Sequence, residues 1–117
     1  MATRDAVSDL IRGNIDAIIL CTLLDGDNYG YEILKEIAET SGGEYEMKEQ
    51  SLYTSLKRLE GQGFVESYWG NETQGARRKY YRITKSGTVE LTEAIDRWIR
   101  VRNIIDRLLI RQDGGAR

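Results

Sequence analysis

The chain has 117 residues, of which 40% are apolar and 31% are charged, a composition typical of a single soluble domain rather than of a disordered segment. No apolar run approaches the roughly 20 residues of a membrane span, and the polar N-terminal stretch does not match a secretory signal, so we expect a cytoplasmic protein. Histidine is absent and Cys21 is the single cysteine, which removes the usual nucleophile–base pairs and the commonest metal ligand; we therefore expect no enzyme, no cofactor and no metal.

The first predicted element is a helix over residues 5–24, because its apolar residues recur at three- and four-residue spacing. From Ile15 to Leu24 the sequence is apolar on nearly every side of that helix, so we expect cover on more than one face. Cys21 lies within this run, and we expect it to be an inert core residue.

A second helix is predicted over residues 29–40, and Asp27 or Asn28 is the expected cap of its first turn. Its inward face should carry the apolar side chains of Tyr29, Ile33, Leu34 and Ile37. A glycine-containing connector, SGGEYEMKE, follows this helix and has room for a short extended segment.

A third helix is predicted from about residue 50, and it ends at Gly61 or Gly63. Three leucines form its buried stripe, because Leu52, Leu56 and Leu59 fall within about 60° of one another around a helix. The opposite face is hydrogen-bonding or cationic and has no carboxylate: it carries Gln50, Thr54, Lys57 and Arg58.

A hairpin should follow, with strands over residues 64–69 and 79–84 and a connecting loop over 70–78. Tyr80 and Tyr81 alternate across the second strand, so one of them is expected to pack inward. Residues 50–82 hold six cations and three anions in a chain of net charge −2, so positive charge gathers here. Three helices followed by a hairpin predict a mainly α fold with a small β part, a winged helix-turn-helix, whose natural partner is duplex DNA.

The candidate DNA contacts fall into two groups. Polar residues near the start of the third helix can reach base edges in the major groove, whereas cations on that helix and on the hairpin suit phosphate. The set is Gln50, Ser51, Tyr53, Thr54, Lys57, Arg58, Arg77, Arg78, Lys79 and Tyr31. Two alternatives stay open: the hairpin cations can serve as edge-strand charges that discourage aggregation, and Tyr53 can belong to the core.

The last predicted helix covers residues 85–111 and carries apolar residues at alternating four- and three-residue spacing, the pattern of a coiled-coil seam. A small winged helix cannot cover so wide a stripe, so we expect residues 1–84 to form the DNA-binding domain, 85–111 a helix for homodimerisation, and 112–117 a flexible tail. The first helix should also contribute to the dimer interface. The expected interface residues are Leu91, Ile95, Trp98, Ile105, Leu108 and Leu109. The alternative is a helix folded back on its own domain.

The motifs GYEILKEI, SLYTSLKRLEGQGFVES and ARRKYYRITKSG resemble the PadR family of bacterial transcriptional regulators. NYGYEI, ESYWGNETQGARRKYYRIT and the late RWIRVRNII are similar to its small subfamily of multidrug-binding repressors. The resemblance implies a winged-helix homodimer that binds a pseudo-palindromic operator and is released by planar aromatic ligands.

In drug-binding members of that subfamily, a tryptophan of the terminal helix and its symmetry mate sandwich the ligand in a flat pore beside the first helix. Trp98 occupies that position, and the implied ligand contacts are Trp98, Ile95, Val101, Arg102, Leu10 and Asn14. Arg102 stands where the pore of a drug-binding relative has an acidic residue, so neutral or anionic ligands are favoured here over cationic ones. Pairing of Arg102 with Glu93, Asp96 or Asp106 is the alternative.

The rival class is a protein-interaction adaptor that uses the winged fold without binding DNA or a ligand. It predicts a helical partner and no retardation of operator DNA at physiological salt.

Overall fold

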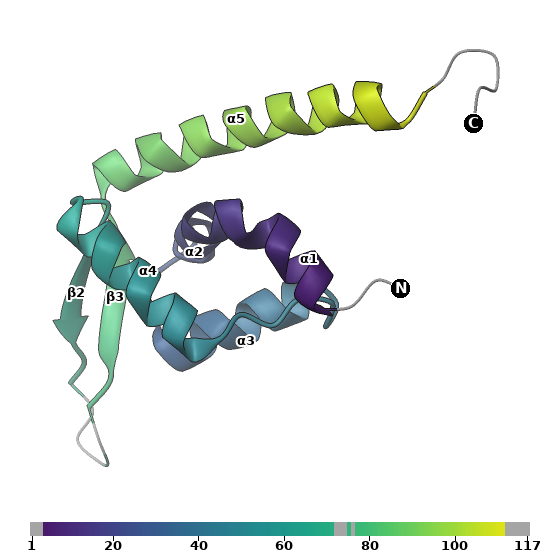
Figure 1. The fold of residues 1–117 in the computed structure, drawn as a ribbon. Helices are drawn as coiled ribbons and strands as arrows, with labels where there is room; N and C mark the ends of the chain where they lie inside the picture. The colour runs from purple at the N-terminus through teal and green to yellow at the C-terminus, as the bar shows by residue number, and fades with distance from the viewer. Residues whose placement is uncertain (1–3, 72–74, 76, 112–117) are drawn as a thin grey trace.

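The computed structural model describes residues 4–71, 75 and 77–111. Most of the helices gather into one body with a β hairpin at its edge, and the long helix α5 extends well beyond that body (Figure 1). In chain order the elements are α1 (Arg4–Ile11), the 3-10 turn η1 (Arg12–Asn14), α2 (Ile15–Thr22), β1 (Asn28–Tyr29), α3 (Gly30–Thr40), α4 (Glu49–Gly61), β2 (Val65–Trp69), β3 (Lys79–Ile83) and α5 (Lys85–Leu109). This order confirms the predicted winged helix with a long C-terminal helix.

The helix predicted over residues 5–24 is interrupted by η1, so the expectation of one continuous helix is wrong. Gly13 lies in the interruption, and glycine is less favourable in a helix than alanine by about 1 kcal/mol. Asn14 follows with φ −113° and ψ 9°, outside the helical range. Asp16 lies in the first turn of α2, where a carboxylate interacts favourably with the helix dipole. α1 and α2 are therefore separate segments.

The sheet contains one strand that the sequence did not indicate. β1 pairs antiparallel with β3, with Asn28 opposite Tyr81 and Tyr29 opposite Tyr80, and the strand order is β1-β3-β2. These two residues also lie at the start of α3. The N-cap position of that helix is Tyr29, which makes no side-chain cap hydrogen bond. The Oδ1 atom of Asn28 instead accepts a hydrogen bond from the Tyr29 backbone N–H at 3.0 Å. The expectation that Asp27 or Asn28 caps this helix is therefore wrong.

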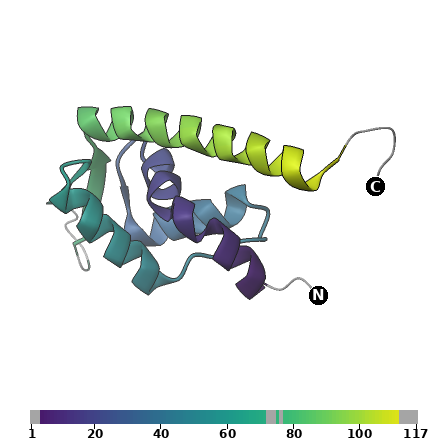
Figure 2. The same cartoon turned by 45° about the horizontal axis from the view of Figure 1, so that its top comes forward.

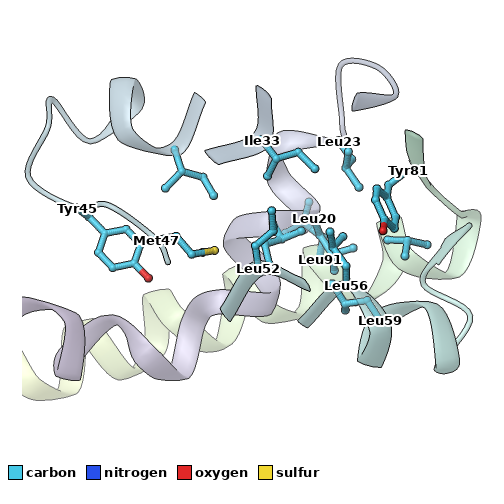
Figure 3. Close-up of a cluster of buried hydrophobic side chains, with 13 residues drawn as sticks. Leu20, Leu23, Ile33, Tyr45, Met47, Leu52, Leu56, Leu59, Tyr81 and Leu91 are labelled. Atoms are coloured by element: carbon cyan, nitrogen blue, oxygen red, sulfur yellow. The ribbon is translucent and has the colours of Figure 1, made fainter. Parts of the chain in front are cut away.

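The core lies between α2, α3 and α4 and is closed by the sheet and α5 (Figure 3). Its fully buried large side chains are Ile19, Leu20, Leu23, Ile33, Leu52, Leu56, Leu59 and Val65. The connector before α4 adds Tyr45 and Met47, both buried. It has no strand among its residues, but the Ser41 hydroxyl accepts from the Tyr45 N–H at 3.0 Å and so folds this segment inward.

α5 begins at a side-chain cap and leaves the domain part-way along its length. The Thr84 Oγ1 atom accepts from the Gly87 N–H at 3.0 Å, and Leu91 is buried in the core. The C-terminal turns of the helix extend past the rest of the domain (Figure 2), and the radius of gyration is 17.0 Å, against about 13 Å for a compact chain of this size. Among the described helices, none combines the length and the apolar character needed to cross a membrane.

Candidate nucleic-acid interface and apolar groove

The outer face of α4 is open and polar. Gln50, Thr54 and Lys57 are exposed there, whereas the leucine stripe on the other side of the helix is buried, as predicted. Two carboxylates lie elsewhere on α4. Glu49 is in the first turn, and the Oε2 atom of Glu60 accepts from the Ser67 hydroxyl at 2.6 Å and so faces the hairpin. A duplex placed against this face would meet hydrogen-bonding groups and a cation.

Two of the predicted DNA contacts are tyrosines, Tyr31 in the first turn of α3 and Tyr53 on α4. Tyr31 is 69% exposed and Tyr53 is 42% exposed, so Tyr53 is not the core residue that the alternative reading allowed. Its ring lies against Gly30, where a Cβ atom would come within 2.0 Å of the Tyr53 hydroxyl oxygen. Glycine at position 30 therefore gives Tyr53 the space to lie against the start of α3.

The hairpin cations are all exposed at the start of β3. The Arg77 Nε atom donates to the Gly70 carbonyl at 3.1 Å, the Arg78 guanidinium lies 4.7 Å from the Tyr29 ring centroid, and the Lys79 ammonium lies 6.0 Å from the ring centroids of both Trp69 and Tyr81. These contacts fix the side chains to the sheet while leaving charge in the solvent.

A row of three tyrosines crosses the sheet. The Tyr80 ring packs edge-on against Tyr29 at 5.4 Å and stacks with Tyr68 at 5.7 Å. The Tyr68 hydroxyl donates to Asp27 at 2.6 Å, and this hydrogen bond raises the pKa of Tyr68. Tyr81, on the other face, is buried, so the prediction that one of the paired tyrosines packs inward is confirmed.

Arg58, which was predicted to contact phosphate, makes an ion pair within its own chain. Its Nε and Nη2 atoms donate to the two carboxylate oxygens of Asp16 on α2, at 3.0 and 2.6 Å. Its Nη2 atom also donates to the Ser55 hydroxyl at 3.0 Å. The hydrogen bond and charge of Asp16 raise the pKa of Arg58. The guanidinium therefore links α2 and α4, while the side chain stays 48% exposed.

An apolar groove of about 380 Å³ lies between the first two helices and α5. It brings together four of the predicted ligand contacts, which are Leu10, Asn14, Ile95 and Trp98, with Ile11, Ala17, Ile18, Cys21, Leu91 and Ala94. Val101 and Arg102 lie further along α5 and are outside this lining. The broken first helix and the middle of α5 thus build a concave surface that is almost wholly hydrocarbon.

Two residues of this region lie differently from expectation. Cys21 is exposed, because α2 turns that side toward the groove rather than toward the core, so the prediction of a core cysteine is wrong. Leu91 is 3% exposed in the core of its own chain, so it attaches α5 to the domain rather than offering a surface to a partner. The other predicted interface residues are exposed: Ile95, Trp98, Ile105, Leu108 and Leu109.

The comparisons with known proteins agree on one protein family. The family model described as the transcriptional regulator PadR-like family matches residues 19–93. An uncharacterised protein from Lysinibacillus sphaericus is 44% identical over 99 residues, which cover 85% of this chain and 91% of that protein. A transcriptional regulator from Clostridium thermocellum has a similar structure, with a TM-score of 0.81, 42% identity and coverage of 87% of this chain and 99% of that one.

Bacillus subtilis PadR, solved in complex with operator DNA, is also similar, with a TM-score of 0.63 and 28% identity over 69% of this chain and 46% of that one. The family model covers more than half of the chain, and its members are transcription regulators rather than enzymes, which confirms the expectation that this protein is not an enzyme. The chain belongs to the PadR-like family of transcriptional regulators.

Proposed function

We propose that the protein is a repressor that holds operator DNA with the outer face of α4 and the hairpin β2–β3. The observation that carries the proposal is the open face of Gln50, Thr54 and Lys57 beside the exposed hairpin cations. The Bacillus subtilis relative, solved with operator DNA, supports the same use of the fold. In this arrangement Gln50 and Thr54 reach base edges, while the cations contact phosphate and displace counterions.

The salt dependence of DNA binding tests the phosphate contacts. Arg77→Ala should weaken binding to every duplex and reduce the slope of log K against log[salt] by about 0.9, the loss of one phosphate contact. Arg100→Ala removes the same charge from an exposed site on α5 and is the control. An unchanged slope in Arg77→Ala removes the phosphate role, and a wild-type protein that retards no duplex favours the adaptor.

We also propose that α5 joins two copies of the chain into a homodimer, which places two α4 helices on a pseudo-palindrome with half-sites about 10.5 base pairs apart. Large apolar side chains along the projecting half of α5 support this, because such contiguous exposure usually marks an interface. The most exposed of them are Val101, Ile105, Leu108 and Leu109.

Sedimentation equilibrium tests the dimer. Ile105→Asp places a charge on the proposed interface, at a side chain that is 44% exposed in the single chain, and it should give a folded monomer. Val89→Asp is the matched control, since Val89 is 54% exposed on the same helix and lies about 160° around the axis from Ile105. Equal dimer populations in the two variants would refute the role of this face.

The groove is the proposed site for planar aromatic ligands that weaken the repressor's hold on DNA. Trp98 and its apolar neighbours offer the stacking surface, and a ligand acts only if it binds one arrangement of the two DNA-binding heads more tightly. Tryptophan fluorescence of Trp69→Phe, titrated with planar aromatic compounds of differing charge, reports on Trp98 alone. Saturable quenching that is accompanied by release of labelled DNA supports the proposal. The double variant Trp69→Phe/Trp98→Ala has no tryptophan, so its ligand binding is measured by displacement of a fluorescent dye. Ligand affinity equal to that of Trp69→Phe would exclude this site.

A further inference from the structure

The ion pair between Asp16 and Arg58 joins two helices that are far apart in sequence. Asp16 lies in the first turn of α2 and Arg58 in the last turn of α4. The pair is bidentate, with distances of 3.0 and 2.6 Å, and the Ser55 hydroxyl holds the same guanidinium from within α4 at 3.0 Å. Asp16 and Ser55 together therefore fix both the orientation and the location of the Arg58 guanidinium.

Burial of the leucine stripe decides which face of α4 points outward, but apolar packing alone leaves small rotations of α4 against α2 undefined. Leu20 on α2 and Leu56 and Leu59 on α4 lie in one core, and hydrocarbon contact is non-directional. A bidentate guanidinium–carboxylate pair, by contrast, is satisfied in only one geometry. Any rotation of α4 about its axis that moves Gln50, Thr54 and Lys57 also pulls Arg58 away from Asp16.

We propose that Asp16 is a positioning residue for DNA recognition, which through Arg58 fixes the rotation at which α4 presents its outer face. The inference rests on the proposed DNA-binding function and assigns Arg58 to this role in place of phosphate contact. The two roles predict opposite signs for one substitution. Removing the negative charge of Asp16 should tighten DNA binding if only charge matters, whereas loss of the ion pair should weaken recognition if orientation matters.

The test uses the full-length protein and a duplex enriched from a random library by the wild type. Asp16→Asn should bind this duplex about tenfold more weakly, a change of about 1.4 kcal/mol, and bind an unselected duplex no less tightly. Arg58→Lys should lose a similar factor, because lysine keeps the charge but cannot make the bidentate pair. The double variant should be no worse than either single one, because both break the same contact.

The structure supplies a matched control for the change in charge. Glu90 borders the same cavity of about 270 Å³ as Asp16, and its side chain is 32% exposed against 35% for Asp16. It pairs with Arg97 on its own helix at 2.9 Å and not with α4. Glu90→Gln therefore removes one negative charge at nearly the same place and should leave recognition of the enriched duplex unchanged.

The outcomes are separable. Weaker, non-additive recognition by Asp16→Asn and Arg58→Lys, with an unchanged salt slope and an unchanged melting temperature, supports the positioning role. Wild-type or tighter binding by Asp16→Asn overturns it, as does an Arg58→Lys variant that binds like the wild type. If the wild type enriches no duplex, the proposed function itself fails and this inference fails with it.

Discussion

Replacing Gly87 by alanine should destabilise the protein, although alanine is the better helix former. Gly87 lies in the first turn of α5, where a Cβ atom would come within 2.1 Å of the Phe64 carbonyl oxygen and 2.9 Å of Ile83 Cγ1. That carbonyl accepts a hydrogen bond from the Thr84 N–H at 3.0 Å. A backbone atom held in this way cannot rotate aside, so either α5 or the start of the hairpin must move.

The magnitude follows from two opposing effects. Alanine gains about 1 kcal/mol of helix propensity over glycine, and forcing a methyl group into a close-packed contact costs about 1–3 kcal/mol. Because the contact here is with backbone, we expect the upper part of that range and a net loss of about 1–2 kcal/mol. For a domain of this size, that loss lowers the melting temperature by about 4–16 °C.

The assay is urea unfolding followed by circular dichroism at a fixed protein concentration, which keeps any association constant. Gly61→Ala is the control, because Gly61 is the last residue of α4 and a Cβ atom there would meet nothing within 4 Å. It should be neutral or stabilising by up to about 1 kcal/mol. A Gly87→Ala variant as stable as Gly61→Ala would refute the packing of α5 against the Phe64 carbonyl.

Three further changes test the core, the cap and the buried phenol. Leu56→Ala, at a side chain that is 1% exposed, should cost about 2–5 kcal/mol in urea unfolding. Thr84→Ala removes the cap of α5 and should cost about 1 kcal/mol, whereas Thr84→Ser should keep most of it. Burial raises the pKa of the Tyr81 phenol above its usual value of 10.0. The unfolded chain therefore ionises first, and the free energy of unfolding falls as the pH rises above about 10. Tyr81→Phe should show a smaller fall.

The elements with a strong local signal were predictable from the sequence. The leucine stripe of α4 and the aromatic, β-branched strands of the hairpin repeat at helical and strand spacing, and the structure places both within a residue or two of the predicted bounds. The exposed polar face of α4 follows from the same periodicity. Local pattern thus gave the winged helix and the residues that point away from its core.

Features that depend on distant partners were not predictable. β1 has two residues, too few to show alternation, and it exists only because β3 offers an edge. The Asp16–Arg58 pair spans 42 residues, and nothing in either segment indicates the other. The exposure of Cys21 was unpredictable for the same reason. A helix that is apolar all round does not indicate which of its faces will pack against the core.

The sequence left two interpretations of the last helix, a dimer arm or a helix folded back on its own domain; the start of α5 fits the second, and the first stays a proposal for the rest of the helix. The helix has 25 residues, or roughly 38 Å at 1.5 Å per residue. Its start packs on α2 through Leu91, which accounts for the folded-back part. After Trp98, which still lines the groove, apolar side chains continue to Leu109, which is 68% exposed. Because the groove opens where these parts meet, beside Ile95 and Trp98, a partner helix and a ligand would both contact the same stretch of α5.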